Sequence, residues 1–599
     1  MRRLALGLAA VLLLRADMYP DASNAKLPAA QANLGGTAVN VRAFGAADDA
    51  RRIQCAVTAT AASSAVTLAP GNALCAFAAA DVGKRIVIYK AGSTATAPLA
   101  TTIAAVTDAT HLTLEAPAGQ SLAAASTWVS WGTDNGPAIQ AAYNQAAKRT
   151  DAAGQQGYVY FPPSDAHGNA AGELHGGYGT ANAIDIAPNS YPAKTAGAGR
   201  FSSILLALAP MASLVGKDAG YVNGVTVSDM TFDGNQLATN VGNMACLPEG
   251  HLRNVSFANP AAGGIGYLHG QPGSGSCPDA KGYDVIVNAV SELYTNAAQY
   301  PAKLMSVNST DTLFSGLSLV GQANTSSLTV EATASNTKLL SPHPWGNTAA
   351  PDQIRVLAAK TTIYDLQGDI GSATNVARIS AAQTSIFGGA VVGPGASTVG
   401  VKIDANTPVP YVSGFNCYEF GGGVPANCIV QDYPAAGSVI VGNPGSQIKP
   451  ANASVANQTK TGTTTTAAPG VFLGLGLTFT PKASGVVQLA FRGSAYNSVL
   501  GNGGSATLKL GTGTTPANAQ ACSTGGGTTV ITGGTPVGMY AFAANQPHAI
   551  SDVAVIGNTT SPLTLGTQYW ADVCIQAVTG GTFSVINADL RAKETQVEQ

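Results

Sequence analysis

Short apolar segments recur along residues 222–440 at a nearly constant interval. VSDMTFDGN at 227–235 aligns with LRNVSFANP at 252–260. Five later segments are almost evenly spaced and centre on Leu317, Leu340, Leu366, Ala390 and Phe415. Leucine-rich repeats have a similar period, but their regular leucine and asparagine consensus is absent from this sequence. A period of about 24 residues with short β segments and Gly/Asn corners predicts a solenoid of parallel strands.

One amphipathic helix precedes these repeats, in GTDNGPAIQAAYNQAAKR at 132–149. Apolar residues at helical spacing line one face of it: Ile139, Ala142, Tyr143 and Ala146. Thr133 or Asp134 is a suitable N-cap, and Pro137 lies in the first turn. The strand GYVYFPP follows at 157–163. Because the open apolar end of a solenoid must be covered, we expect the helix to cap the first coil.

Alternating apolar positions on either side of this region predict further β structure. A short strand and a compact β insert are expected within 36–130, and the capping helix and β-helix within 131–440. The Thr-, Gly- and Pro-rich stretch 441–470 is typical of a linker. Strong alternation in 471–599 predicts a β-sandwich.

Three motifs carry a resemblance to a known family: VRAFGA, TDNGPAIQAAYNQA and GYVYFPP. Together they resemble the start of pectate-lyase-superfamily right-handed β-helices. The sequence departs from that pattern by splitting the motifs with the insert, which is similar to inserts of phage tailspikes. LTFTPKASGVVQLAF and LTLGTQYWADVCIQAVTGGTFSV resemble jelly-roll tip domains of phage tail fibres, which are usually trimeric. The resemblance implies an all-β chain: a right-handed parallel β-helix with one capping helix, a β insert, a C-terminal β-sandwich and homotrimeric assembly.

Charge is sparse in this chain of 599 residues. Only 10% of residues are charged, the formal net charge is −2, and the sequence contains no dense Lys/Arg run. Nucleic-acid binders gain most of their affinity from neutralising phosphates, so a nucleic-acid partner is not expected. Weakly charged partners such as polysaccharides fit this composition better.

The N-terminal residues 1–25 have the pattern of a secretory signal peptide. Arg2 and Arg3 precede an apolar run that starts at Leu4 and ends at Leu14. The run is too short to span a bilayer, so no membrane span is expected in the mature chain. An uncleaved N-terminal helix is the alternative.

Eight cysteines fall into four local pairs: Cys55 with Cys75, Cys246 with Cys277, Cys417 with Cys428, and Cys522 with Cys574. An even count behind a signal-like start indicates disulfides and an oxidising compartment, although buried free thiols remain the alternative. No CxxC spacing or carboxylate cluster marks a metal site, so neither a metal nor another cofactor is expected.

Candidate catalytic residues follow from the chemistry of glycosidic cleavage, which uses two carboxylates roughly 5–9.5 Å apart. Asp229 and Asp233 in VSDMTFDGN are the first candidates, and Asp284 lies on a later coil. The alternative is structural, because Asp233 starts a DGN turn and Asp229 aligns with Asn254 in a polar ladder. The Gly-His-Gly and paired-aspartate pattern of polygalacturonase-like members is not met.

Candidate substrate-binding residues are aromatic or imidazole side chains near these coils: Tyr267, His269, His343 and Trp345. Exposed rings would stack on sugars, whereas buried rings would fill coil corners. The leading hypothesis is therefore a tailspike-like extracellular protein that binds polysaccharide and cleaves it if the carboxylates converge. The alternatives are a non-catalytic trimeric adhesin or structural tail protein, and a secreted bacterial lyase or glycoside hydrolase. The expected location is extracellular, with a virion tail as the alternative.

Overall fold

The computed structural model describes most of the chain between residues 38 and 594. It does not describe residues 1–37, 71, 148–156, 165–171, 189–192, 218–223, 245–248, 271–279, 291–292, 370–374, 394–397, 405–406, 418–427, 432–438, 442, 444–451, 461–469, 482–484, 524–530, 533–536, 541–546, 557–562, 565 and 595–599. The chain forms two compact units, Met1–Lys402 with Pro410–Phe420, and Ile403–Val409 with Gly421–Gln599.

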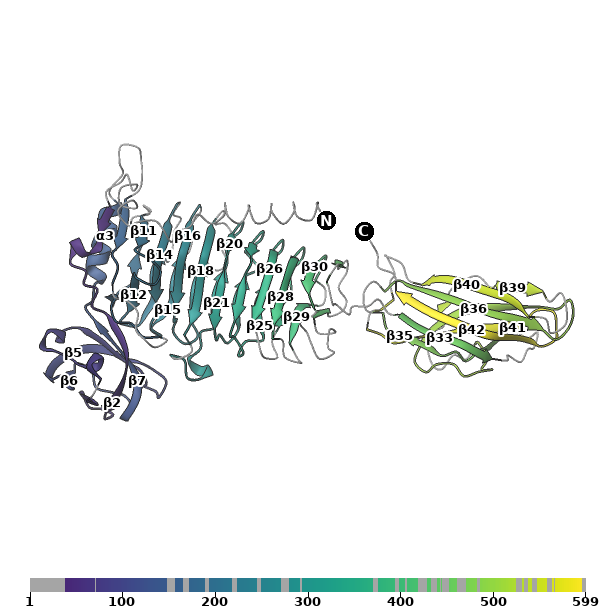
Figure 1. The fold of residues 1–599 in the computed structure, drawn as a ribbon, viewed down its shortest axis with the longest axis horizontal. Helices are drawn as coiled ribbons and strands as arrows, with labels where there is room; N and C mark the ends of the chain where they lie inside the picture. Colours follow the sequence, from purple (N-terminus) through teal and green to yellow (C-terminus); the bar gives the residue numbers. More distant parts are fainter. Residues whose placement is uncertain are drawn as a thin grey trace, which may run out of the picture. The chain divides into compact units, whose positions relative to one another are not determined.

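A parallel β-solenoid of about eight turns dominates the first unit (Figure 1). Its long sheet contains, in spatial order, β1 (Ala38–Asn40), β8 (Tyr158–Phe161), β11 (Lys194–Gly197), β14 (Thr226–Asp233), β16 (His251–Ala258), β18 (Lys281–Ala289), β20 (Leu313–Ser315), β23 (Lys338–Leu340), β26 (Thr362–Asp369), β28 (Ser385–Val392) and β30 (Tyr411–Asn416). The same sheet includes β9 (Tyr178–Thr180), β12 (Ile204–Ala207), β21 (Ser318–Gly321) and β24 (His343–Trp345).

A second sheet forms the other side of the coils. It contains, in spatial order, β10 (Ile184–Asp185), β13 (Met211–Lys217), β15 (Ala238–Met244), β17 (Ile265–His269), β19 (Lys303–Val307), β22 (Ser326–Val330), β25 (Asp352–Val356), β27 (Asn375–Ile379) and β29 (Val399–Ile403). The short strands β31 (Ile429–Gln431) and β32 (Val439–Val441) follow along the chain, and η6 (Ala297–Gln299) is a 3-10 turn between coils.

The register explains the sequence period, because each strand pairs in parallel with its equivalent one coil later. Phe232 of β14 lies opposite Phe257 of β16, which lies opposite Val287 of β18, and all three are buried. The rings of Phe232 and Phe257 stack with centroids 5.5 Å apart, and Phe257 stacks on Tyr267 of the second sheet at 4.5 Å. The apolar segments of the sequence are therefore the inner lining of successive coils.

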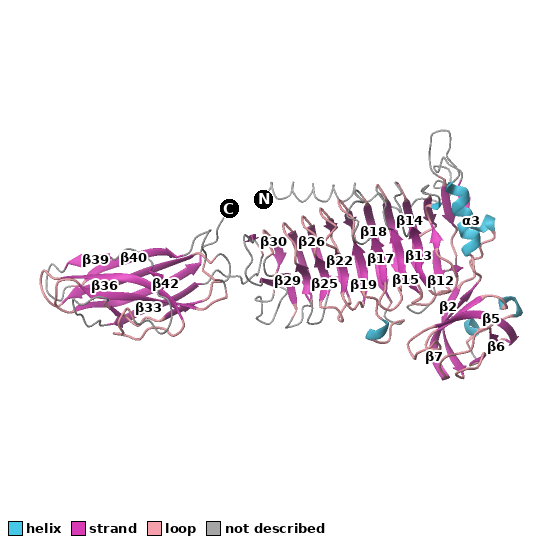
Figure 2. Ribbon diagram, turned by 180° about the vertical axis from the view of Figure 1, so that it is seen from behind, coloured by secondary structure: helices cyan, strands magenta, loops and turns pink. Residues whose placement is uncertain are grey.

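The helix α3 (Gly136–Ala147) packs against β1, β8 and β10 at the start of the solenoid (Figure 2). Its buried face contains the predicted apolar residues, and the Tyr143 hydroxyl lies 2.8 Å from the Thr195 hydroxyl of β11. Asp134 accepts hydrogen bonds from the backbone N–H groups of Gly136 and Ala181, so its side chain fixes the first turn. The predicted capping role of the helix is confirmed.

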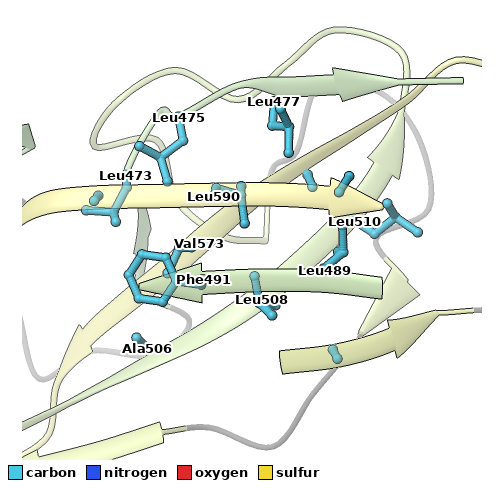
Figure 3. Close-up of a cluster of buried hydrophobic side chains, with 14 of the residues drawn as sticks. Leu473, Leu475, Leu477, Leu489, Phe491, Ala506, Leu508, Leu510, Val573 and Leu590 are labelled. Atoms are coloured by element: carbon cyan, nitrogen blue, oxygen red, sulfur yellow. The ribbon is translucent and has the colours of Figure 1, made fainter. Parts of the chain in front are cut away.

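The C-terminal unit contains two antiparallel sheets around an apolar core (Figure 3). One sheet is β33 (Asn452–Lys460), β42 (Phe583–Glu594), β36 (Val487–Asn497) and β40 (His548–Ile556). The other comprises β34 (Val471–Phe472), β35 (Leu477–Phe479), β41 (Tyr569–Ala577), β37 (Gly503–Thr512), β38 (Ile531–Thr532) and β39 (Val537–Tyr540). The sequence 441–470, expected as a linker, supplies β33, which pairs with β42.

The insert is a closed six-stranded barrel between β1 and α3. Its strands are β2 (Arg51–Ala59), β3 (Ala65–Leu68), β4 (Arg85–Ile88), β5 (Leu99–Asp108), β6 (His111–Leu114) and β7 (Leu122–Gly132). Two short 3-10 turns belong to it, η3 (Ala73–Cys75) and η4 (Ala79–Asp81), whereas η2 (Val41–Phe44) packs against α3, β1 and β8. Because β1 pairs in parallel with β8, the barrel interrupts the first coil without displacing it. The predicted fold class, including the insert and the sandwich, is confirmed.

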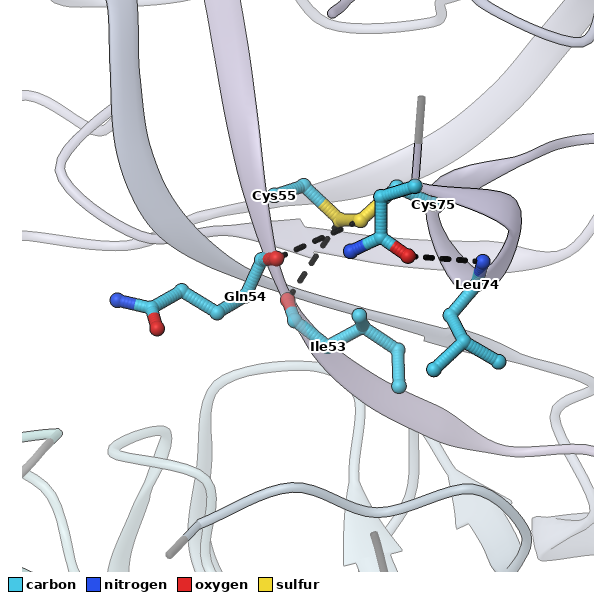
Figure 4. Close-up of a disulfide and its surroundings, with 6 residues drawn as sticks. Ile53, Gln54, Cys55, Leu74 and Cys75 are labelled. Carbon is cyan, nitrogen blue, oxygen red and sulfur yellow. Dashed lines mark hydrogen bonds between the residues drawn. A yellow bond between two sulfur atoms is a disulfide. The ribbon is translucent and has the colours of Figure 1, made fainter. Parts of the chain in front are cut away.

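Disulfides join cysteines that lie close in the sequence. Cys55 and Cys75 are bonded within the barrel, with Cα atoms 5.8 Å apart (Figure 4). Cys522 and Cys574 are bonded in the sandwich, with Cα atoms 6.1 Å apart. Cys417 and Cys428 are also disulfide-bonded. The remaining predicted pair, Cys246 and Cys277, lies outside the described residues.

Candidate functional site

One residue of every coil from β14 to β30 in the long sheet adopts a left-handed backbone conformation. These residues lie opposite one another in register, with φ between 48° and 72°: Asp229, Asn254, Asp284, Gly316, Ser341, Asp365, Gly388 and Gly414. We call this row the corner column, since the chain bends there between two β segments. Gly adopts this conformation without penalty, and Asn and Asp tolerate it better than other side chains.

Side chains along the corner column bond to one another between coils. Asn254 Nδ2 donates to Asp229 Oδ1 at 2.8 Å, and Ser341 Oγ donates to Asp365 Oδ2 at 3.0 Å. Asp229 and Asp284 stand two coils apart with Asn254 between them. From the inter-strand spacing, their Cα atoms are separated by about 10 Å. The predicted polar ladder is present, and two of the three predicted catalytic residues belong to it.

Arg200 lies beside these two aspartates, in the loop between β11 and β12. Its Nη1 donates to the backbone carbonyl of Asp284 at 3.3 Å, and its guanidinium covers the Phe201 ring at 4.9 Å. Burial lowers the pKa of Arg200, while the charges of Asp284 and Asp229 act in the opposite direction. Phe201 is 57% exposed. We call Arg200, Phe201, Asp229 and Asp284 the Arg200 cluster.

Asp233 is not part of this cluster, because it is buried against the barrel. Its Oδ2 lies 2.8 Å from Nη2 of Arg52, and both side chains are almost fully buried. Asn259 Nδ2 and the backbone N–H of Asn235 also donate to the Asp233 carboxylate, at 3.0 and 2.9 Å. Asp233 therefore joins barrel strand β2 to β14 and is occupied by structural partners.

Tyr267 and His269, predicted to bind substrate, both lie inside the solenoid. They are buried, and the Tyr267 hydroxyl is 2.8 Å from His269 Nδ1. Burial lowers the pKa of His269 to about 4 and raises that of Tyr267. Residues of β17 that are two apart share a face, and here that face is the inner one. These side chains therefore line the core rather than an outer surface.

His343 and Trp345 of β24 lie on the outside, as a sugar-binding role requires. Trp345 is 44% exposed, and its ring stacks beside His343 with an interplanar angle of 20° and centroids 6.3 Å apart. His343 Nε2 lies 2.9 Å from Asp369 Oδ2 on the next coil. We call His343, Trp345 and Asp369 the Trp345 platform. The partnership with Asp369 was missed from sequence, although the separation of the two residues matches the coil period.

A second row of aromatic side chains lies on the following coils, on the other side of the corner column. Tyr364 of β26 stacks on Phe387 of β28 with centroids 5.3 Å apart, and Phe387 contacts Tyr411 of β30 at 5.2 Å. Tyr364 and Asp369 are on one strand, on opposite sides of the corner residue Asp365. Exposed rings therefore flank the corner column on both sides.

The described residues contain no cluster of three or more His, Cys, Asp or Glu side chains arranged to hold a metal ion. Among those same residues, no helix has the length and apolar character that crossing a membrane requires.

No protein-family profile matches the chain, and no curated protein matches it. Similar solved structures include ORF18 of Geobacillus virus E2, with 14% identity and a TM-score of 0.36 over 71% of this chain and 73% of that one. A tailspike protein mutant of E. coli bacteriophage HK620, solved with a hexasaccharide, has 9% identity and a TM-score of 0.36 over 78% and 90%. The A-module of mannuronan C-5 epimerase AlgE6 from Azotobacter vinelandii has 14% identity and a TM-score of 0.31 over 52% and 95%.

Structural neighbours are thus phage tailspike proteins and β-helix enzymes, the classes that the sequence resembles. At identities of 9–14% and TM-scores of 0.31–0.36, we rest no conclusion about function on these likenesses. The narrower assignment to pectate-lyase-like enzymes stays a prediction.

Proposed function

We propose that this protein binds polysaccharide along the outer surface of the long sheet, with the Trp345 platform as its central contact. The observation that carries the proposal is an exposed tryptophan held beside His343, whose ring is fixed by Asp369 of the next coil. An indole face covers the apolar side of a sugar ring, while neighbouring polar groups orient its hydroxyls. A platform fixed across two coils is pre-organised for this contact, which limits the entropy cost of binding.

The arrangement of the aromatic rings favours a polymer over a single sugar. Tyr364, Phe387 and Tyr411 form a second aromatic row across the corner column from the Trp345 platform, and each lies about 4.8 Å further along the solenoid. A longer oligosaccharide would contact more of these coils, so affinity should rise with chain length.

Binding is tested by titrating purified protein with oligosaccharides of increasing length from bacterial surface polysaccharides. We expect Trp345→Ala to weaken binding at least about tenfold, because a central aromatic contact commonly contributes more than about 1 kcal/mol. Phe44→Ala is the matched control, since Phe44 is a comparably exposed ring in η2. Equal losses in both variants, or none in either, would remove the platform from the proposal.

Cleavage is the second candidate function, and the Arg200 cluster favours it. Asp229 and Asp284 both belong to the corner column, with about 10 Å between their Cα atoms, a spacing that allows their carboxylates to lie within the roughly 6.5–9.5 Å that inverting glycosidases use. Arg200 bonds to the backbone carbonyl of Asp284 and feels the charges of both aspartates, so it would bring a positive charge to a sugar bound at this place.

Reducing-end release and ultraviolet absorbance of unsaturated products distinguish hydrolysis, elimination and no reaction. Asp229→Asn and Asp284→Asn should each abolish release if the cluster is catalytic. Release that survives both substitutions would exclude these residues, and binding without release would leave a non-catalytic adhesin.

We also propose that the protein acts outside the cytoplasm or on a virion tail, as a homotrimer assembled through its C-terminal unit. The disulfide-bonded cysteines support an oxidising environment. Light scattering should give three times the chain mass of 59.9 kDa. A monomeric mass would refute the trimer and leave the binding proposal in place.

A further inference from the structure

Three large aliphatic side chains are exposed at one end of the C-terminal sandwich. Val499 and Leu500, in the turn between β36 and β37, are 46% and 64% exposed. Val578, in the turn between β41 and β42, is 53% exposed. Single exposed apolar residues are normal on a protein surface, whereas a group of them marks an interaction site. We call Val499, Leu500 and Val578 the apolar tip.

Hydrogen bonds hold the two turns of the apolar tip side by side. The backbone N–H of Ser498 donates to the Thr582 carbonyl at 3.0 Å, and the backbone N–H of Thr582 donates to the Ser498 hydroxyl at 2.8 Å. A Cβ on Gly581 would approach Val499 Cγ2 to 3.1 Å, so the second turn also packs against a side chain of the first. The apolar tip is therefore one surface, although its residues are far apart in the sequence.

A buried asparagine fixes the shape of both turns from below. Asn497 is fully buried, its Nδ2 donates to the Gly580 carbonyl at 2.9 Å, and its Oδ1 accepts from the backbone N–H of Val499 at 3.0 Å. The backbone N–H of Val578 donates to the Gly503 carbonyl at 2.9 Å, which joins the second turn to the first strand after the other turn. The exposed side chains are thus positioned before any partner binds, and this limits the entropy cost of contact.

Neither turn contains an ionisable residue. The two turns read SVLGN at 498–502 and VTGGT at 578–582. The nearest charged residues in the sequence are Arg492 and Lys509 around the first turn, and Asp572 and Asp589 around the second. A partner of the apolar tip is therefore recognised by apolar contact and by hydrogen bonds to uncharged groups.

The size of the apolar tip suits a lipid surface better than a protein partner. Stable protein interfaces bury about 800 Å² on each partner, over roughly 20–30 residues. The tip consists of two five-residue turns. Binding to the interface of a bilayer instead scales with the apolar area that enters the boundary between headgroups and acyl chains, so a few protruding aliphatic side chains are sufficient for contact.

We propose that the apolar tip inserts its three side chains into the interface of a zwitterionic lipid bilayer. The contact attaches the C-terminal unit reversibly, with no membrane-spanning segment involved. Because the two turns lack charge, attachment requires neither anionic lipid nor low salt. The proposal does not rest on polysaccharide binding, since the Trp345 platform belongs to the other unit. Either site can fail without the other.

The test measures co-sedimentation of the full-length protein with phosphatidylcholine vesicles. We expect binding that is the same at low and high salt. Leu500→Ser should weaken the partition into lipid at least about tenfold, because it removes the most exposed side chain of the tip. Val555→Ser is the matched control and should have no effect. Val555 is 61% exposed on β40 and lies opposite Gln488, at the other end of β36 from the tip.

A tryptophan probe separates insertion from misfolding. Leu500→Trp and Val555→Trp place the same indole at the apolar tip and at the control position. Vesicles of brominated phosphatidylcholine should quench the emission of Leu500→Trp and leave that of Val555→Trp unchanged. A misfolded chain would not show this difference.

Five outcomes would each overturn the proposal. They are no binding of the unmodified protein, binding to anionic vesicles alone, equal losses in Leu500→Ser and Val555→Ser, equal quenching in the two tryptophan variants, and a change of oligomeric mass in Leu500→Ser. The last would assign the apolar tip to a contact between copies of the chain.

Discussion

The buried ion pair between Arg52 and Asp233 should control how firmly the barrel is attached to the solenoid. Arg52 bonds to Asp233 at 2.8 Å, to the Gly172 carbonyl at 2.6 Å and to Asn235 Oδ1 at 3.3 Å, and its side chain is almost fully buried. Arg52→Met keeps much of the side-chain volume but removes the charge. The Asp233 carboxylate would then be buried with no cation beside it.

The free energy that Arg52→Met should cost follows from how deeply the ion pair is buried. Removing one partner of a buried pair costs about 3–5 kcal/mol. Asp233 retains hydrogen bonds from Asn235 and Asn259, so we expect the lower end, about 3 kcal/mol. The pair formed by Lys84 and Asp49 has nearly the same length, 2.9 Å, but its side chains are 20% and 30% exposed. Lys84→Met should therefore cost no more than about 1 kcal/mol.

Native-state hydrogen exchange on peptides from β7 and β14 measures this attachment directly. Arg52→Met should lower protection there by about 100-fold, with little change in β28. Lys84→Met should lower it only a few-fold. If the two variants lose protection equally, burial does not decide the strength of the pair and the reasoning is refuted.

Three further predictions concern the pH dependence of stability and the strain of the backbone. The pKa of His269 falls from 6.5 to about 4 on folding, so protons favour the unfolded chain and about 3 kcal/mol of stability should disappear as pH drops from 6.5 to 4. His269→Phe should flatten that dependence in denaturant titrations. Burial raises the pKa of Asp572 from 3.8 to about 6, so the C-terminal unit should lose about 3 kcal/mol as pH rises through that interval. Asp572→Asn should abolish that part of the pH dependence of melting. Gly414→Ala should cost about 1–2 kcal/mol through backbone strain alone, since a Cβ there meets nothing nearer than 3.5 Å. Gly316→Ala should cost more, because its Cβ would approach Asp284 Oδ1 to 2.7 Å, and thermal melting of the two variants compares these costs.

The fold could be predicted because every coil of a solenoid needs buried residues at equivalent positions, and this requirement appears in the sequence as a regular period. Each coil repeats the same inward positions, so Phe232 and Phe257 recur one period apart and lie opposite each other. The capping helix could also be predicted, since Ile139 and Tyr143 lie on one buried face at helical spacing.

The candidate site was harder to predict from the sequence, because it depends on the direction in which side chains point and on partners far away in the chain. Asp233 reads as a turn residue, yet its partner Arg52 belongs to the barrel and lies far earlier in the chain. Tyr267 and His269 have the chemistry of a sugar site, but the strand parity that turns them inward is not visible in their spacing. Asp369 could have been found by adding one coil period to His343.

The corner column also bears on how such a protein can change over time. Each coil from β14 to β30 contains its own bend-forming residue. A duplicated coil would therefore already contain the left-handed residue that its bend requires. Aspartate meets the backbone requirement about as well as asparagine, which means that a carboxylate can enter the column by one substitution without rebuilding a strand. Length and surface chemistry can therefore vary separately in this solenoid.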